Sequence, residues 1–228
     1  MSAISSQTKP ISPLIRLGRF LFSLLSGLFA GVVVLGTAMF FFNNLNITEK
    51  TAWYITRSSG TVAYLLISAS TIWGLLLSSK IIKETVPALL SLAMHNFLSW
   101  AAIGITGLHM IALLFDSYLT YTVADLLIPF VGPYRPEWVG LGIIGYYLML
   151  LTSVSFYFRK QIGQKRWRKL HYLTFGAYLL ATIHGIMAGT DSGLSTMKIV
   201  YWGSGLSVLF LTNYRILTAK LSARRARP

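Results

Sequence analysis

The feature that most constrains this chain is a series of apolar runs long enough to cross a lipid bilayer. About 20 consecutive apolar residues span the hydrocarbon core as a helix. Apolar residues make up 54% of the 228 residues and charged residues only 11%, whereas a soluble domain of this length needs a charged surface. The runs occupy residues 19–42, 60–79, 88–115, 138–158, 170–188 and 198–217. The sequence therefore predicts an all-α membrane protein, a bundle of six transmembrane helices.

The connections between these runs are short, so we expect one membrane domain and no soluble domain. The six-helix domain would cover residues 19–218, between an N-terminal cytoplasmic segment (1–18) and a basic cytoplasmic tail (219–228). The first run follows basic residues, as a secretory signal does. It is about 24 residues long and lacks an obvious small-residue cleavage site, so we expect a retained helix.

The positive charge of the chain is unevenly distributed over the connections. The formal net charge is +14, and with the N-terminus placed inside, 16 of the 20 lysines and arginines fall on the inner side. Five of the six acidic residues then fall on the outer side. Because lysine and arginine are retained on the cytoplasmic side, the pattern predicts cytoplasmic N and C termini. The charge thus indicates membrane orientation and not a nucleic-acid partner. The compact loops, and not any targeting motif, lead us to expect a bacterial inner membrane.

All four histidines of the chain lie inside apolar runs. His95 and His109 belong to the third run, and His171 and His184 to the fifth. Ionisable residues inside a bilayer are costly and usually mark a functional path. A single histidine could serve a hydrogen bond between helices, but four histidines arranged as two similarly spaced pairs favour a common functional site.

The spacing within the third run places both of its histidines near one helix face. Fourteen residues separate His95 from His109, which leaves them about 40° apart around the axis and about 21 Å apart along it. The third and fifth runs are parallel in a six-helix topology. We therefore expect His95 to meet His171 (the inner pair) and His109 to meet His184 (the outer pair). Each level can offer two imidazoles to one flat, iron-centred ligand between the helices.

The spacing within the fifth run is less regular. Thirteen residues separate His171 from His184, which on an ideal helix places them about 140° apart. Either His171 lies in an irregular first turn after the basic loop, or the helix is distorted near Gly176. The sequence does not choose between these two explanations.

The number of ligands favours haem over a bare metal ion. Zinc and copper also bind imidazole, but two nitrogen ligands per level fall short of the usual tetrahedral set. Haem held by two axial imidazoles needs only these ligands, and it leaves no open iron position for substrate. The chain has no cysteine, so any haem is bound noncovalently. A nonredox metal transporter remains the alternative from another class.

Four segments of the chain resemble the ferric reductase-like transmembrane domain of ferric-chelate reductases, NADPH oxidases and the bacterial haem subunit of periplasmic methionine sulfoxide reductase. They are "YITRSSGTVAYLLISASTIWGLLLSS", "HNFLSWAAIGITGLHM", "FVGPYRPEWVGLGIIGYYLMLL" and "RWRKLHYLTFGAYLLATIHGIMAGTD", and the resemblance covers roughly residues 52–190. The histidine spacings of 14 and 13 are the specific part of this resemblance. It implies two b-type haems between the third and fifth helices, with His95, His109, His171 and His184 as axial iron ligands.

Two further residues are candidates for the cofactor environment. The resemblance suggests that Arg57, at the outer end of the second run, lies beside the outer haem and the electron acceptor. The alternative is that its side chain reaches the lipid headgroups. Tyr178 and Ala102 each follow an inner histidine by seven residues and return to within about 20° of its face. Tyr178 could fill the space between the haem edges, but its position favours an ordinary core aromatic residue.

These features predict transmembrane electron transfer by a two-haem cytochrome b. Many eukaryotic members of the resembled family continue into a flavin and nicotinamide domain, but this chain stops soon after the sixth run and leaves no room for a nucleotide-binding fold. We therefore expect a membrane oxidoreductase component that needs a separate flavoprotein or quinol as electron donor. Ferric iron, oxygen or a periplasmic reductase could accept the electrons. A quinol-fed haem subunit of a periplasmic reductase is the alternative within this class.

Overall fold

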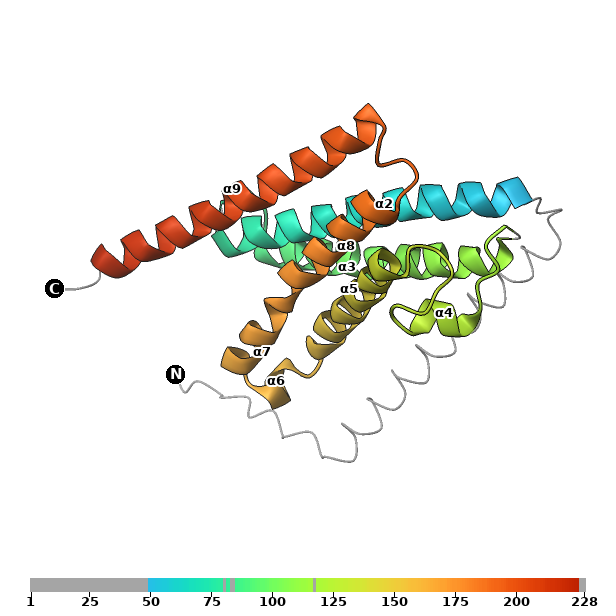
Figure 1. Cartoon of the computed structure of the whole chain (residues 1–228). Coiled ribbons are helices and arrows are strands. Elements are labelled where there is room, and N and C mark those ends of the chain that lie inside the picture. The colour runs from blue at the N-terminus through green and yellow to red at the C-terminus, as the bar shows by residue number, and fades with distance from the viewer. Residues whose placement is uncertain (1–48, 80, 83–84, 117, 226–228) are drawn as a thin grey trace. The chain divides into compact units, whose positions relative to one another are not determined.

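The computed structural model describes residues 49–79, 81–82, 85–116 and 118–225, and every regular element in these residues is helical. The elements are α2 (Glu49–Ser79), α3 (Ala88–Ala112), the short 3₁₀ helix η1 (Leu113–Phe115), α4 (Val123–Leu127), α5 (Pro136–Ser155), α6 (Arg159–Ile162), α7 (Gln164–His171), α8 (Leu173–Ala188) and α9 (Ser195–Arg225) (Figure 1). The N-terminal segment, the first apolar run and the end of the basic tail lie outside the described residues.

Three of the described helices are long and apolar enough to cross a membrane. They are Lys50–Ser79, Ala88–Phe115 and Pro136–Ser155, and they correspond to the second, third and fourth runs of the sequence. The fifth run is divided, because α8 has 16 residues and is preceded by a break after α7. The sixth run lies within the 31 residues of α9. The fold is thus helical, as expected, with three candidate membrane-spanning helices.

The long helices form two antiparallel pairs. α2 lies beside α3, with Trp73 Nε1 donating to the Ser91 carbonyl (3.0 Å) near one end and His109 Nδ1 bonded to the Thr56 carbonyl (2.8 Å) near the other. α5 lies beside α8, and α9 packs along α2 (Figure 1). A buried cluster joins these helices and contains Tyr64, Ile67, Leu75, Ala102, Tyr178, Val208 and Leu211.

The irregularity of the fifth run lies at Tyr172, between α7 and α8. The Tyr172 amide bonds to the Lys169 carbonyl (3.2 Å) and the Phe175 amide bonds to the Tyr172 carbonyl (3.1 Å). Both are tighter contacts between residues i and i−3, so the chain turns further per residue here than in an α-helix. α8 continues without a break through Gly176. Of the two explanations for the 13-residue spacing, the structure selects the irregular turn next to His171.

The outward-facing side chains of the bundle are apolar over much of its surface. On α9 alone, Ile199 and Trp202 are each 71% exposed and Phe210 is 67% exposed. Water-exposed surfaces of monomeric soluble proteins rarely carry continuous apolar patches, whereas lipid tails solvate them without cost. This surface indicates contact with a lipid bilayer.

Candidate functional site: two histidine pairs

The structure brings the four histidines together as the inner and outer pairs. The ring centres of His95 and His171 lie 6.1 Å apart with the ring planes at 83°. Those of His109 and His184 lie 6.3 Å apart with the planes at 74°. This pairing is the one expected from parallel third and fifth helices. α3 supplies His95 and His109, α7 supplies His171 and α8 supplies His184.

The separation within each pair suits one metal ion between two imidazoles. A metal–imidazole bond is about 2.0 Å long and the ring centre lies about 1.1 Å behind the bonding nitrogen, so two imidazoles on opposite sides of one ion have centres about 6.2 Å apart. The observed values are 6.1 and 6.3 Å. Both pairs therefore have the spacing that linear coordination by two imidazoles requires.

Hydrogen bonds to backbone carbonyls fix the rings of the outer pair. His109 Nδ1 bonds to the Thr56 carbonyl of α2 at 2.8 Å, and His184 Nδ1 bonds to the Trp138 carbonyl of α5 at 3.0 Å. A carbonyl can only accept, so Nδ1 carries the proton in both rings and Nε2 keeps its lone pair. Histidines that bind metals are held in this way. Each of these two histidines thus makes a hydrogen bond to a neighbouring helix through Nδ1. Its Nε2 atom stays available to bind a metal.

Glycines on neighbouring helices make room for three of the four rings. A Cβ atom at Gly142 would lie 2.8 Å from Cγ and Nδ1 of His184, and one at Gly60 would lie 3.0 Å from Cε1 and Nδ1 of His109. A Cβ atom at Gly74 would lie 3.0 Å from Cε1 of His95. Larger residues would displace these rings. Our reading of the sequence missed these glycines.

A signal for two of these glycines is present in the sequence. Gly60 and Gly74 are 14 residues apart, the same spacing as His95 and His109. In an antiparallel helix pair, equal spacings on the two helices place each glycine opposite one histidine. The matched spacings could therefore have predicted the contact between α2 and α3.

The inner pair has weaker support from hydrogen bonds. His95 Nδ1 reaches the Ser70 hydroxyl at 3.5 Å, and that hydroxyl also bonds to the Ser99 hydroxyl at 2.8 Å. His171 Nδ1 is buried and has no hydrogen-bond partner among the described residues. Its ring instead stacks on the indole of Trp167, with ring centres 5.1 Å apart and planes at 21°. Aromatic packing, and not a carbonyl acceptor, orients this ring.

The outer pair borders a cavity of about 520 Å³. A volume of this size lies within the range of cofactor and ligand pockets, roughly 300–1,000 Å³. Its lining is mainly apolar and includes Tyr64, Tyr121, Tyr134, Tyr146 and Tyr201. Tyr121 lies outside the membrane-spanning segments, and burial, with smaller effects of Tyr134, Asp125 and Asp116, raises its pKa to about 12. Its hydroxyl therefore stays protonated at neutral pH.

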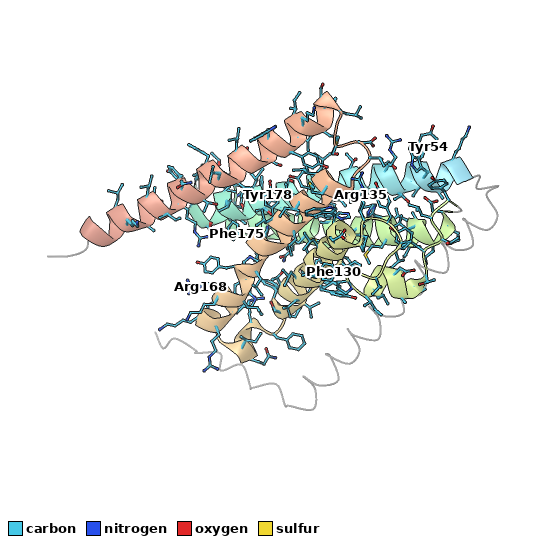
Figure 2. All side chains as sticks on the ribbon, viewed as in Figure 1. Tyr54, Phe130, Arg135, Arg168, Phe175 and Tyr178 are labelled. Carbon is cyan, nitrogen blue, oxygen red and sulfur yellow. The ribbon has the colours of Figure 1, made fainter. Side chains whose placement is uncertain are left out.

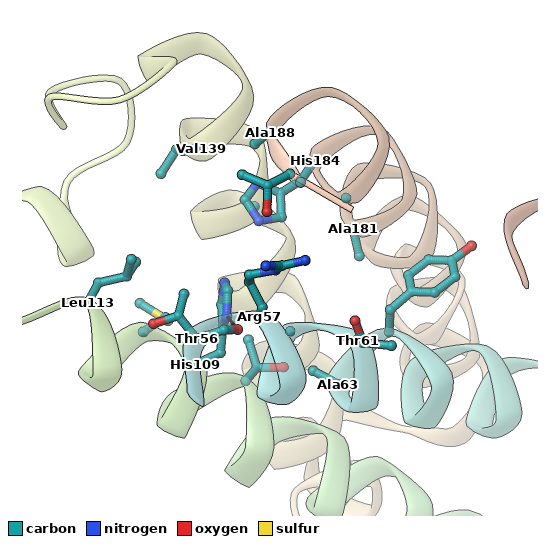
Figure 3. Close-up of a pocket in the computed structure, with 18 of the residues that line it drawn as sticks. Thr56, Arg57, Thr61, Ala63, His109, Leu113, Val139, Ala181, His184 and Ala188 are labelled. Atoms are coloured by element: carbon teal, nitrogen blue, oxygen red, sulfur yellow. Dashed lines mark hydrogen bonds between the residues drawn. The ribbon is translucent and has the colours of Figure 1, made fainter. Parts of the chain in front are cut away.

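Arg57 lines the same cavity as His109 and His184 (Figure 3). Its guanidinium forms an ion pair with Asp191 in the connection between α8 and α9, including a bond of 2.8 Å from Nε to Oδ2. The guanidinium also lies 3.9 Å from the centre of the Trp53 ring. Arg57 therefore lies beside the outer pair and is paired within the protein. Asp191 was not predicted from the sequence as the partner of Arg57.

Tyr178 is buried between the levels of the two histidine pairs, where α8 passes α2 and α9 (Figure 2). Its hydroxyl donates to the Ser204 hydroxyl at 3.0 Å, and its ring stacks on Tyr64 with centres 6.2 Å apart. Tyr178 and Ala102 belong to the same buried cluster. The hydroxyl is thus satisfied by α2 and α9, as in an ordinary core tyrosine.

Each candidate centre consists of two histidines. In the part of the chain that the structure describes, no group of three or more histidine, cysteine, aspartate or glutamate side chains could hold a metal ion. The chain matches no protein-family model, no curated protein and no solved structure. The function therefore has to be argued from the geometry of the two pairs.

Proposed function

We propose that this chain is a two-haem b-type cytochrome of the ferric reductase-like kind, which carries electrons across a membrane from a cytoplasmic donor to an external acceptor. The observation that supports it is the pair of two-histidine centres at different depths, each with the spacing for one ion between two imidazoles. Haem suits a two-ligand centre because the porphyrin supplies the four remaining nitrogens.

In this proposal His95 and His171 hold the inner haem, and His109 and His184 hold the outer haem. Haem iron bound in this way changes between the ferric and ferrous states and so supplies one-electron transfer. The protein orients the ligands through the carbonyls of Thr56 and Trp138. The apolar helices exclude water. Arg57, which lines the cavity beside His109 and His184, would lie next to the outer haem on the side from which an acceptor would approach.

The proposed topology has six membrane-spanning helices with both termini in the cytoplasm. Three candidate spans support it, together with α9, whose 31 residues extend about 46 Å and exceed the bilayer core. α7 and α8 would cross together as the fifth span. A bacterial inner membrane is the proposed location.

The electron balance of the proposed reaction is simple. Each electron lost by a reduced flavin or a quinol on the donor side is gained by the external acceptor, which is ferric iron, oxygen or the cofactor of a periplasmic reductase. Protons released by the donor stay on its own side. The chain returns to its starting state after each transfer.

The test of this function is a dithionite-reduced minus oxidised absorption spectrum of the purified chain, after expression with sufficient haem. We expect b-type haem bands and a pyridine haemochrome content of two haems per chain. The matched control is the double variant His95→Ala, His109→Ala, which keeps α8 unchanged and should lack both haems.

A spectrum without b-type bands would contradict the proposal. In that case zinc or copper content, measured on the same preparation, would decide whether the alternative of a nonredox metal transporter deserves pursuit.

The donor can be identified through the basic segment Arg159–Lys169, which leads into His171. Replacing Lys165, Arg166 and Lys169 with glutamine leaves other basic residues to maintain orientation. We expect slower reduction of the inner haem by an acidic flavoprotein at low salt and convergence with the parent chain at high salt. Rates that are equal at both salts, with haem content intact, would assign these charges to orientation and favour quinol as the donor.

A further inference from the structure

The two histidine pairs differ in the groups that face their non-coordinating nitrogens. Both Nδ1 atoms of the outer pair bond to carbonyls, at 2.8 and 3.0 Å. In the inner pair, one Nδ1 has a hydroxyl at 3.5 Å and the other has no partner among the described residues. An acceptor on Nδ1 makes the imidazole a stronger donor through Nε2. Stronger donation stabilises the oxidised metal and lowers its reduction potential.

The charges around the two pairs differ in the same direction. Two cations, Lys50 and Arg57, and three carboxylates, Asp116, Asp125 and Asp191, line the outer cavity. Arg57 is moreover neutralised by its ion pair with Asp191.

Among the residues that the structure describes, the charged groups next to the inner pair are cations. The chain contains no aspartate or glutamate between Glu137 and Asp191, and none after Asp191. Arg168 and Lys169 lie in the last turn of α7, beside His171. Arg215 of α9 donates to the Tyr172 hydroxyl at 3.5 Å. Positive charge near a redox centre stabilises the added electron and raises the reduction potential.

We infer that the centre held by the inner pair has the higher reduction potential of the two. The inference rests on the proposed function, because it concerns the haems placed there. It assigns the contrast to identifiable groups: the carbonyls of Thr56 and Trp138 lower the outer potential, and Arg215 with its basic neighbours raises the inner one.

This order of potentials has a consequence for electron flow. An electron from a cytoplasmic donor rests on the inner centre and reaches the outer centre when an external acceptor removes electrons there. A membrane potential that is negative inside favours the outward movement of the electron and offsets the unfavourable order. When the protein holds a single electron, that electron therefore resides mainly on the inner haem. The outer haem, which faces the acceptor, is then mostly oxidised.

The experiment is a potentiometric titration of the purified full chain, followed by the haem absorption bands. We expect two one-electron waves. His171→Ala should remove the wave at higher potential, and His184→Ala should remove the wave at lower potential. Loss of the higher wave in His184→Ala, or two haems that titrate as one wave, would overturn the inference.

A second set of variants keeps both histidine pairs, in case the histidine variants do not fold. Arg215→Gln should shift the higher wave to lower potential and leave the lower wave in place. Lys198→Gln is the matched control, because it removes one positive charge from the same helix about 26 Å away along the axis, and it should leave the higher wave unchanged. An unchanged higher wave in Arg215→Gln would overturn the assigned role of this charge. A chain that binds no haem would refute the proposed function itself, which separates the two failures.

Discussion

The outer and inner histidine pairs have nearly the same ring separation but are held by different forces. In the outer pair, main-chain carbonyls of α2 and α5 hold both rings. In the inner pair, a serine hydroxyl reaches one ring and the indole of Trp167 stacks on the other. Ring separation alone therefore does not define a ligand site, because the groups behind the rings decide how firmly they are oriented and how strongly they donate.

The four histidines give the sharpest test of this comparison and the largest expected effect. His109→Ala or His184→Ala should remove the outer haem, and His95→Ala or His171→Ala the inner haem, because residues of equal depth pair between parallel helices. We expect haem content to fall by half in each single variant, measured by pyridine haemochrome. Crossed pairing, such as loss of one common haem in His95→Ala and His184→Ala, would contradict the observed geometry.

The glycines behind the rings give the next largest effect. Gly142→Ala places a Cβ atom 2.8 Å from the His184 ring, which must then move away from the Trp138 carbonyl. We expect about 10- to 100-fold weaker haem binding at the outer pair, as for other residues that orient metal ligands. Haem retention during gel filtration, compared at each level, measures this effect.

Gly104→Ala is the matched control for that substitution. It lies on α3 between the two histidines, and a Cβ atom there meets no other atom within 4 Å. Equal haem loss in both alanine variants would mean that the contact between Gly142 and His184 is unimportant.

Substitutions in the ion pair between Arg57 and Asp191 test how strongly the connection between α8 and α9 stabilises the region next to the outer pair. The side chains are 28% and 23% exposed, so removing one partner leaves a partly buried charge without compensation. We expect Arg57→Gln to lower the free energy of unfolding by about 1–2 kcal/mol, with Asp191→Asn of similar size and the double variant less than additive. Denaturant unfolding in detergent measures the cycle. Full additivity would show that the two side chains do not interact.

Substitutions of Tyr178 test the contribution of the side chains packed between the two histidine pairs. Tyr178→Phe removes the bond to Ser204 and should cost about 1 kcal/mol of stability, because the Ser204 hydroxyl retains Tyr64 at 2.9 Å. Tyr178→Leu also removes the ring. If the rate of electron transfer between the two haems is unchanged in Tyr178→Leu, with both haems bound, the predicted role of Tyr178 between the haem edges is wrong.

The smallest expected effect concerns α4, whose first turn is capped by Thr122 and Asp125. Hydrogen bonds from the hydroxyl and the amide of Thr122 hold the pKa of Asp125 below its ordinary value of 3.8. A carboxyl with a depressed pKa stabilises the folded state above its unfolded pKa, and this contribution is lost as the pH falls through the folded pKa. We expect hydrogen exchange in α4 to become faster, relative to the rest of the chain, when the pH is lowered below about 4.

Thr122→Val is the control for this pH dependence, because it removes the hydroxyl that bonds to Asp125. The variant should show faster exchange in α4 already at neutral pH and a weaker change on acidification. An unaltered pH dependence in Thr122→Val would remove Thr122 as the cause.

The sequence by itself determined the helical class, three candidate spans and the pairing of the histidines. Long apolar runs leave few alternatives to helices in a bilayer, because every backbone group must be satisfied within its own segment. The 14-residue spacing fixes the relative angle and depth of His95 and His109. His171 was harder to place, because the tight turn at Tyr172 changes the rotation that an ideal helix would give.

The tertiary structure alone decided which groups contact the non-coordinating nitrogen of each histidine ring and which residue pairs with Arg57. The bonds of His109 to Thr56 and of His184 to Trp138 join residues 53 and 46 positions apart, and the ion pair of Arg57 with Asp191 spans 134 positions. Such contacts depend on how far each helix is rotated about its axis and on where two helices cross. An apolar run facing lipid on one side and protein on the other carries little information about rotation, because both environments accept the same side chains. The two pairs therefore look alike in sequence, and packing between the helices makes them different.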